Sequence, residues 1–255
     1  IGIISGDGNL PIYICNALKN KNFDVTVLSL NNNNKKYFKN HKIIDIDILS
    51  IKKILKILEN NNIQNIIFAG SIKRPSINDL GFDIQTFLLA KNLFLEKKGD
   101  NNLLISLKKY FEKKGYIFFD WTKYCNELFS TETNLTKFKP SKKAILNLKK
   151  AKSIYHTYKK IDVGQAMIIQ NQLVLGLEAI EGTDELIKRC ADHKRKGDYG
   201  ILLKFSKKHQ SNLIDIPLVG LDTIKNIKKF NYEGIFLQKN KCLILDKKKI
   251  IDYAN

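Results

Sequence analysis

Apolar residues in the first half of the chain occur in short continuous runs that alternate with segments of helical spacing. Runs of about four to eight apolar residues are typical of buried strands, and apolar residues three and four apart indicate helices. This alternation predicts a parallel sheet with crossover helices. The predicted strands span 1–5, 23–30, 63–69 and 116–119, and the predicted helices span 12–20, 51–58 and 103–113.

The second half of the chain combines a hairpin with further strands and helices. Apolar residues alternate imperfectly through 166–169 and 173–177, and the polar turn Gln170-Asn171-Gln172 between them predicts a β-hairpin. Ser141 is predicted to cap a lysine-rich helix that ends near 159. Further strands are expected at 200–205, 235–237 and 242–245, with helices from 183 onward, at 223–230 and at the end of the chain.

The stretch 120–140 has few periodic cues, and we place a domain boundary there. The prediction is an α/β protein of two α/β domains. Residues 1–128 form a nucleotide-binding-like domain, Rossmann-like with a mainly parallel sheet, and residues 129–255 form a mixed α/β catalytic domain. No charged-then-apolar signal segment and no apolar run long enough to span a bilayer is visible.

The net charge of +19 raises the question of a nucleic-acid or anionic membrane partner. Of the 44 basic residues only Arg74, Arg189 and Arg195 are arginines, and the lysines are spread along the chain. This distribution favours a generally solvated basic surface over a dedicated nucleic-acid patch. The cysteines and histidines lack zinc-site spacing, so a metal would be held by oxygen ligands, with Mg²⁺ or Mn²⁺ as the candidates.

Three carboxylates and a hydroxyl gather where the hairpin leads into a helix. Glu178, Glu181 and Asp184 surround Thr183, which is expected to cap the helix. Helix N-termini attract phosphate and clustered carboxylates attract a hard cation, so a diphosphate with its metal would suit this place. In the alternative interpretation the acids are ordinary surface residues and Thr183 is only a cap.

Two further segments offer contacts to anions. The loop Gly6-Asp7-Gly8 follows the first strand and precedes a helix, although Pro11 stands where a dinucleotide fingerprint needs its third glycine. Lys73 and Arg74 follow the strand that ends near 69, where open α/β sheets bind ligands. The alternative is that both cations lie on a solvated loop.

Asp215 is the leading candidate for chemistry. It lies between apolar neighbours just before Pro217, where a carboxylate is held in place, and Lys204 lies near the end of a predicted strand upstream. The alternative is a turn aspartate that only braces the loop.

With these residues in view, the chain resembles the UDP-2,3-diacylglucosamine diphosphatases of lipid A biosynthesis, the type unrelated to calcineurin-like metallophosphoesterases. The resemblance covers 3–223 and is strongest from Asp162-Val163-Gly164-Gln165 to Arg189. Asp7, Asn101, Lys208, Ser211 and Leu213 depart from the family pattern. The matching motifs are Asp162 to Gln165, Glu178 to Asp184 with Arg189, Gly6 to Pro11, Gly70 with Arg74 and Pro75, Gly99-Asp100, and Lys204 with Gln210, Asp215, Pro217 and Gly220.

The resemblance implies Mg²⁺-dependent hydrolysis of UDP-2,3-diacylglucosamine to UMP and 2,3-diacylglucosamine 1-phosphate, called lipid X. It also implies a ligand site between the domains, a homodimer, and a cytoplasmic protein that is peripheral on the inner membrane. Asp215, Glu181 and Asp184 are the implied catalytic residues, with Asp215 and Asp184 on the metal. The implied substrate-binding residues are Gly6, Asp7, Gly8, Lys73, Arg74, Gln165, Glu178, Thr183, Lys204 and Gln210.

Two hypotheses from other functional classes remain open. One is a Rossmann-type nucleotide-binding enzyme of different chemistry, such as a nicotinamide-dependent oxidoreductase, and the incomplete glycine fingerprint speaks against it. The other is a basic nucleic-acid-binding protein, which predicts salt-sensitive binding to any duplex. Neither accounts for the stretch from Glu178 to Asp184.

Overall fold

The computed structural model describes residues 1–30, 36–38, 40–48, 50–71, 100–158, 163–207, 213–214 and 216–255. Packing divides the chain into two compact units. Unit 1 comprises Ile1–Asn126 with Ser211–Ile214, and unit 2 comprises Glu127–Gln210 with Asp215–Asn255. Each unit contains a sheet and helices, so the predicted fold class of two α/β domains is confirmed.

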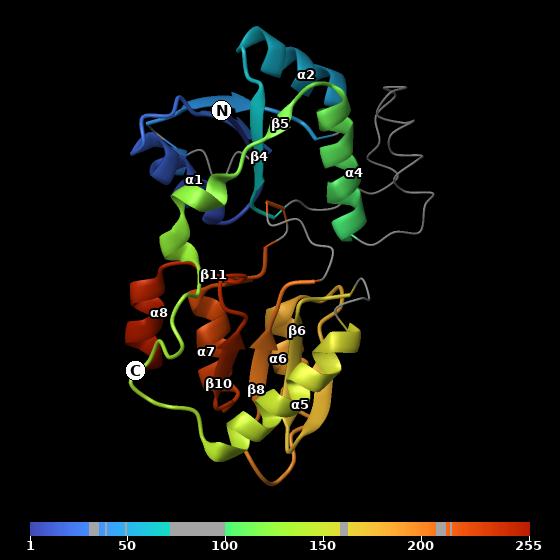
Figure 1. Cartoon of the computed structure of the whole chain (residues 1–255), viewed down its shortest axis with the longest axis vertical. Helices are drawn as coiled ribbons and strands as arrows, with labels where there is room; N and C mark the ends of the chain where they lie inside the picture. The colour runs from blue at the N-terminus through green and yellow to red at the C-terminus, as the bar shows by residue number, and fades with distance from the viewer. Residues whose placement is uncertain are drawn as a thin grey trace. The chain divides into compact units, whose positions relative to one another are not determined.

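The five-stranded sheet of unit 1 is parallel throughout, as the alternation of strands and helices predicted (Figure 1). Its order is β3-β2-β1-β4-β5. The strand β3 was not predicted, because its four residues are exposed or only half-buried and form no continuous apolar run. The strands are β1 (Gly2–Ser5), β2 (Thr26–Ser29), β3 (Lys42–Asp45), β4 (Asn65–Ala69) and β5 (Ile117–Phe118).

Helices cover both faces of this sheet. On one face, Ile4 of β1 packs with buried side chains of α2 (Ile51–Asn60) and α4 (Asp100–Lys113). The helix α1 (Leu10–Lys19) lies on the opposite side of β4 from α4, as Figure 1 shows. Pro11 stands in its first turn, where the missing N–H group costs no helical hydrogen bond.

The sheet of unit 2 has the order β10-β8-β6-β7 and mixes parallel and antiparallel pairs. The predicted hairpin is confirmed: β6 and β7 pair antiparallel across a turn in which Asn171 and Gln172 have φ of 50° and 60°. Two positive φ angles are typical of the type I′ turn that matches strand twist. The strands are β6 (Ala166–Gln170), β7 (Leu173–Leu177), β8 (Ile201–Lys204) and β10 (Gly234–Leu237).

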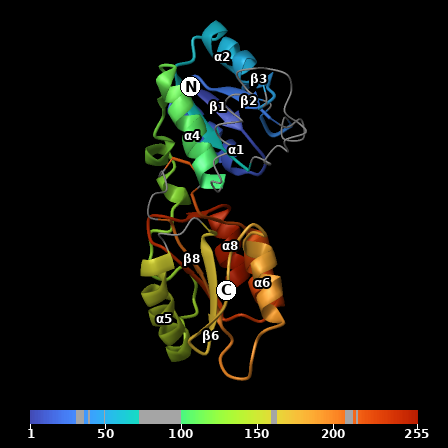
Figure 2. The same ribbon diagram turned by 90° about the vertical axis from the view of Figure 1, so that its right-hand side faces the viewer.

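Alternation along β6 assigns its side chains to two separate cores. Met167 and Ile169 pack with α5 (Lys142–Tyr158), whereas Ala166 and Ile168 pack with the helices α6 and α7. Figure 2 shows α5 and α6 on opposite sides of β6 and β8. The Oγ of Ser141 accepts a hydrogen bond from the N–H of Ala144 at 3.1 Å, which confirms the predicted cap of α5. The two opposing helices are α6 (Thr183–Ala191) and α7 (Leu221–Lys229).

Smaller elements complete the described chain. Two 3₁₀ turns, η3 (Trp121–Tyr124) and η4 (Asn126–Leu128), precede the pair of short parallel strands β9 (Leu218–Val219) and β11 (Leu243–Ile244) and the final helix α8 (Lys247–Ala254). The strand β9 was not predicted, because two residues give no periodicity. Of the helices within the described ranges, none combines the length and the apolar character that crossing a bilayer requires.

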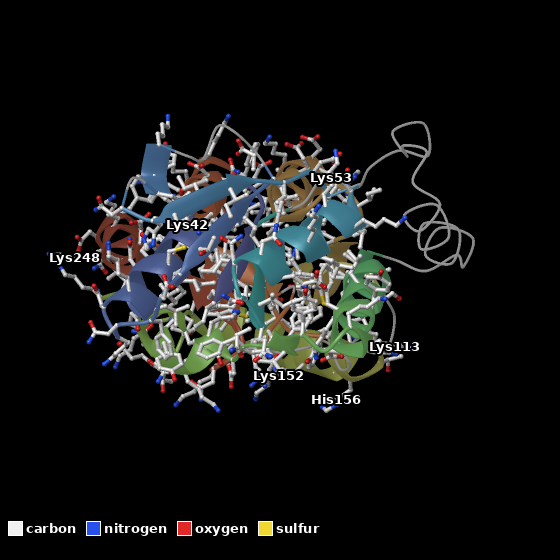
Figure 3. The ribbon with its side chains drawn as sticks, turned by 90° about the horizontal axis from the view of Figure 1, so that it is seen from above. Lys42, Lys53, Lys113, Lys152, His156 and Lys248 are labelled. Carbon is white, nitrogen blue, oxygen red and sulfur yellow. The ribbon has the colours of Figure 1, made fainter. Side chains whose placement is uncertain are left out.

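The lysines are distributed over many elements. Figure 3 labels Lys42 of β3, Lys53 of α2, Lys113 of α4, Lys152 of α5 and Lys248 of α8. These side chains come from both units, and they are not concentrated in one segment.

Candidate functional site

One end of the unit 2 sheet brings together four of the predicted site residues. Strand register places Ala166 opposite Lys204 and Met167 opposite Leu177, so the start of β6 adjoins the ends of β7 and β8. Gln165, Glu178 and Lys204 therefore lie at one end of the sheet, and α6 begins there with Thr183. Because β8 and β10 run parallel, this is the end where their carboxyl termini meet, the position at which open α/β sheets bind ligands.

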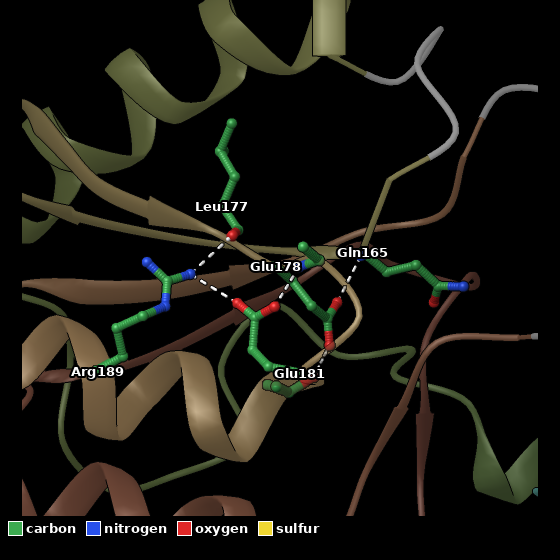
Figure 4. Close-up of polar contacts among 7 residues, drawn as sticks. Gln165, Leu177, Glu178, Glu181 and Arg189 are labelled. Carbon is green, nitrogen blue, oxygen red and sulfur yellow. Dashed lines mark hydrogen bonds and ion pairs between the residues drawn. The ribbon is translucent and has the colours of Figure 1, made fainter. Parts of the chain in front are cut away.

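Glu178 lies at the centre of this arrangement. We call the four residues Gln165, Glu178, Thr183 and Lys204 the Glu178 cluster. Its Oε1 accepts a hydrogen bond from the hydroxyl of Thr183 at 2.6 Å, and its Oε2 accepts one from the backbone N–H of Gln165 at 2.5 Å (Figure 4). All four residues are at most 9% exposed. A buried carboxylate requires such partners, because an unpaired charge in a low-dielectric environment is strongly unfavourable.

Gly164 permits this arrangement by having no side chain. Its N–H donates to the carbonyl oxygen of Glu178 at 2.9 Å, and a Cβ at Gly164 would lie 2.4 Å from both Cβ and Cγ of Glu178. Any larger residue would displace Glu178. Gly164 belongs to the family motif but was not predicted as a site residue, because a sequence does not show how closely two backbone segments approach each other.

Thr183 joins Glu178 to Lys204. The Nζ of Lys204 donates a hydrogen bond to the Oγ1 of Thr183 at 2.7 Å. The prediction that Thr183 caps α6 was wrong: Gly182, with φ of 79°, occupies the N-cap position and Thr183 is the first helical residue. The hydroxyl is turned into the cluster instead, because two buried charged groups compete for it more strongly than a helix terminus does.

The backbone of Lys204 is held as firmly as its side chain. Its carbonyl oxygen accepts hydrogen bonds from the N–H of Gln238 at 3.0 Å and from the thiol of Cys242 at 3.4 Å. Burial raises the pKa of the Cys242 thiol to about 11, so the thiol remains protonated and acts as a donor. Lys204 is thereby fixed at the carboxyl end of β8.

Glu181 contacts Arg189 at the margin of the cluster. The Nη2 of Arg189 donates to the Oε1 of Glu181 at 2.6 Å and to the carbonyl oxygen of Leu177 at 3.1 Å, while Ala179 N–H donates to Oε2 of Glu181 at 3.2 Å (Figure 4). The hydrogen bond from Arg189 lowers the pKa of Glu181. Both carboxylate oxygens of Glu181 therefore stabilise the loop between β7 and α6. Arg189 was quoted in the family motif but not assigned to the site.

Asp184 differs from these two glutamates. Its Oδ1 is buried and has no hydrogen-bond partner among the described residues. It belongs to the first turn of α6, where the helix dipole favours negative charge. An oxygen of this kind could serve as one metal ligand.

In unit 1 the predicted anion-binding loop pairs with the end of a neighbouring strand. Asp7 and Ser71 exchange two backbone hydrogen bonds of 2.7 and 2.9 Å, and the N–H of Gly6 donates to the carbonyl oxygen of Ala69 at 2.9 Å. The N–H groups of Gly6 and Asp7 are thus committed to the sheet. Gly8, with φ of 92°, continues the loop towards α1.

Several predicted site residues lie outside the described residues: Lys73, Arg74, Gln210 and Asp215. Their roles stay predictions. Within the described ranges, no group of three histidine, cysteine, aspartate or glutamate side chains is arranged to hold a metal ion.

Comparison with known proteins relates both halves of the chain to one family. Residues 1–128 match the model of the LpxI N-terminal domain, and residues 131–255 match that of the LpxI C-terminal domain. The UDP-2,3-diacylglucosamine pyrophosphatase LpxI of Caulobacter vibrioides is 26% identical over 262 residues, which cover 100% of this chain and 94% of that protein.

Proposed function

The chain belongs to the LpxI family, and we propose that it hydrolyses the diphosphate bond of UDP-2,3-diacylglucosamine. The products would be UMP and 2,3-diacylglucosamine 1-phosphate, or lipid X. The reaction is the hydrolysis of a phosphorus anhydride in lipid A biosynthesis.

The strongest support for this proposal is the length of the chain that the family models and the related protein match. Both family domains are present in order, and the relative named for this activity aligns along the whole chain. The Glu178 cluster supports it from the structure, because it places a buried cation at the carboxyl end of β8, where an anionic ligand would bind.

The chemistry we propose is in-line attack of water on phosphorus, in which positioning and charge stabilisation supply most of the catalysis. Asp215 is proposed to orient the attacking water. Gly6, Asp7 and Gly8, with Lys73 and Arg74, are proposed to hold the nucleotide, through groups other than the N–H of Gly6 and Asp7, which are bonded within the sheet.

Mg²⁺ dependence belongs to the same proposal, with Mn²⁺ as the alternative ion. Among the described residues Asp184 offers one unpartnered carboxylate oxygen, whereas the carboxylates of Glu178 and Glu181 already accept hydrogen bonds. One ligand does not make a metal site, so the described residues alone do not fit the ion. The ligands that we propose are Asp184 and Asp215, and Asp215 lies outside the described residues.

The two acyl chains of the substrate also bear on where the protein works. We propose a cytoplasmic protein that is peripheral on the inner membrane and acts as a homodimer. A basic surface with a net charge of +19 would favour contact with anionic lipid headgroups.

Mass spectrometry of the products tests the function. Purified protein with UDP-2,3-diacylglucosamine should release UMP and lipid X when Mg²⁺ is present and should cease to do so with a chelator. Water labelled with ¹⁸O would show which phosphorus is attacked. Folded protein that releases neither product under any metal condition would contradict the proposal.

Asp215→Ala tests the leading catalytic residue. We expect this variant to lose most turnover, to stay folded and to retain substrate binding. Asp222→Ala is the matched control, because Asp222 is an exposed aspartate that pairs only with Lys225 on its own helix among the described contacts. Full activity of Asp215→Ala would remove Asp215 from the mechanism.

A further inference from the structure

Exposed apolar side chains gather around the hairpin turn of unit 2. Nine large apolar side chains are exposed among the residues that the structure describes, and four of them lie on segments that meet beside this turn. These four are between 39% and 58% exposed: Leu146, Leu173, Val174 and Tyr199. An exposed apolar residue that stands alone is ordinary, whereas a group of them marks an interaction surface.

Hydrogen bonds join the three segments that carry these side chains. The N–H of Gln172 donates to Oδ1 of Asn147 at 2.7 Å, and the side-chain amide of Asn147 donates to Asp198 at 3.0 Å. The side-chain amide of Asn171 donates to the carbonyl oxygen of Lys196 at 3.1 Å. Each of the four apolar residues lies within two positions of one of these contacts, so all four belong to one region of the surface.

The loop between α6 and β8 is held firmly in this region. The side-chain amide of Gln170 donates to the carbonyl oxygens of Arg195 at 2.9 Å and of Asp198 at 2.6 Å. A Cβ at Gly197 would lie 2.1 Å from Oδ1 of Asn171, so the loop and the turn pack closely. Figures 1 and 2 show this loop, in orange, at the lower end of unit 2, beyond the strands. A fixed loop presents its side chains at little entropic cost.

Cations surround the apolar side chains. The segment 193–199 contains three lysine or arginine residues and one carboxylate, that of Asp198. The side chains of Arg195 and Lys196 are exposed, and within the described part of the chain neither pairs with a carboxylate. The helix α5 contains no acidic residue. Leu146 has a lysine three and four positions away on each side, at Lys142, Lys143, Lys149 and Lys150.

We propose that this part of unit 2 docks onto an anionic lipid bilayer. Aliphatic side chains enter the apolar boundary of a bilayer, tyrosine lies at the level of the headgroups, and lysine and arginine contact anionic headgroups. The residues that would make these contacts, which we call the hairpin-end surface, are Leu146, Leu173, Val174, Arg195, Lys196 and Tyr199.

Other occupants suit the hairpin-end surface less well. A second copy of the chain related by a two-fold axis would bring the same patch, and therefore the same cations, face to face. A nucleic acid would contact the cations through its phosphates and stack its bases on aromatic rings, but it would leave the aliphatic side chains without a partner. An anionic bilayer complements both the charge and the apolar character.

The hairpin-end surface and the Glu178 cluster lie at opposite ends of the unit 2 sheet. In the strand register, Gln170 and Leu173 are paired at one end, and Ala166 and Lys204 are paired at the other. Docking would therefore leave the Glu178 cluster uncovered. The inference deepens the proposed function and rests on it for the reason that the protein meets a bilayer.

Sedimentation with lipid vesicles tests the inference. We expect the full chain to bind vesicles of equimolar phosphatidylglycerol and phosphatidylcholine, and to bind phosphatidylcholine alone more weakly. Arg195→Gln combined with Lys196→Gln should lower the affinity for the anionic vesicles by roughly 10- to 30-fold, since each cation near such a surface contributes about fivefold. Leu173→Ser should lower it by about fivefold.

Matched controls separate the surface from net charge and from general hydrophobicity. Lys113→Gln combined with Lys248→Gln removes the same charge from two exposed lysines outside the surface (Figure 3). Ile117→Ser replaces a side chain that is 57% exposed, close to the 51% of Leu173. Both controls should keep the vesicle affinity within about twofold of the wild type. Melting temperatures are measured for every variant.

Several results would overturn the inference. One is a wild type that does not sediment with the anionic vesicles, and another is an equal loss of affinity in the surface variants and their controls. Light scattering that shows a fall in mass from two chains to one in Leu173→Ser would identify a subunit interface. Unchanged vesicle binding with loss of duplex DNA binding in the arginine–lysine variant would identify a nucleic-acid surface.

Vesicle binding is measured without substrate, so this inference and the proposed function can fail separately. Folded protein that binds vesicles as expected but forms no product would contradict the proposed function alone. With substrate dissolved in detergent, the surface variants should keep turnover within about twofold of the wild type, because they leave the Glu178 cluster unchanged. Loss of that turnover would contradict a role confined to docking.

Discussion

The two ends of the unit 2 sheet each carry a carboxylate that gathers hydrogen bonds from several elements. At one end, Glu178 binds Gln165, Thr183 and, through Thr183, Lys204. At the other end, beside the hairpin turn, Asp198 accepts hydrogen bonds from the N–H of Asn171 at 2.9 Å, the N–H of Gly200 at 2.8 Å and the side-chain amide of Asn147 at 3.0 Å.

The two carboxylates differ in the groups with which they form hydrogen bonds. These three hydrogen-bond donors to Asp198 are neutral, and they join α5, the hairpin turn and the loop before β8 into one fixed corner. Glu178 makes the same kind of contact to the backbone N–H of Gln165, but it also balances a buried cation at the carboxyl end of β8. A carboxylate that accepts backbone N–H groups is a general means of fixing loops, and the addition of a charged partner distinguishes the end suited to chemistry.

The largest effect should come from adding a side chain beside Glu178. Gly164→Ala would place a Cβ 2.5 Å from the carbonyl oxygen of Glu178 and 2.4 Å from its side chain, so the cluster must move. We expect the free energy of unfolding to fall by roughly 2–4 kcal/mol, with loss of most turnover. Urea denaturation and product formation are the measurements.

Gly220→Ala is the control for this change. A Cβ at Gly220 meets nothing within 4 Å, and its φ of −111° suits any residue. If Gly164→Ala were as stable and as active as Gly220→Ala, the packing described around Glu178 would be wrong.

A matched pair of amide substitutions sharpens the comparison between the two ends. Glu178→Gln and Asp198→Asn each remove one acceptor from a carboxylate with several donors, so each should cost about 1–3 kcal/mol of stability. Only Glu178→Gln should lower kcat/KM, by roughly 10-fold or more, because it alone alters the charge balance around Lys204. Equal losses of kcat/KM in the two variants would show that the two ends do not differ in function.

The smallest effect concerns Glu181 and pH. Arg189 lowers the pKa of Glu181 below its ordinary value of 4.5, so the ionised form is favoured in the folded state. The pair therefore stabilises the protein above pH 4.5, and this contribution is lost as the pH falls through the lowered pKa. Because both side chains are partly exposed, we expect less than about 1 kcal/mol.

Stability measured between pH 7 and pH 3 checks this. Glu181→Gln should flatten part of the acid limb of the stability curve, whereas Glu185→Gln, which alters an exposed pair on the same helix, should leave the curve closer to that of the wild type. An unchanged acid limb in Glu181→Gln would contradict the role assigned to the pair.

Apart from β3 and β9, the sequence predicted the described strands and α-helices in their order, because continuous apolar runs and helical spacing report burial directly. It also implied, through the family resemblance, that Glu178, Thr183 and Lys204 bind the substrate. It missed β3, whose residues are not fully buried, and β9, which has only two residues.

The contacts within the site were not predictable in the same way. Thr183 was expected to cap a helix, but its hydroxyl bonds to Glu178 and Lys204, which approach it from β7 and β8. Local propensity cannot reveal such partners, because they depend on strand register and on the close approach that Gly164 allows. Asp215, Lys73, Arg74 and Gln210 lie outside the described residues, and their roles remain predictions.

The most direct test is a parallel product assay on the wild type, Glu178→Gln and Asp198→Asn with UDP-2,3-diacylglucosamine. UMP and lipid X are quantified by mass spectrometry at matched concentrations of folded protein. We predict that the wild type and Asp198→Asn form both products at rates within about twofold of each other, while Glu178→Gln is slower by roughly 10-fold or more. No products from the folded wild type, or equal rates from all three proteins, would contradict the account.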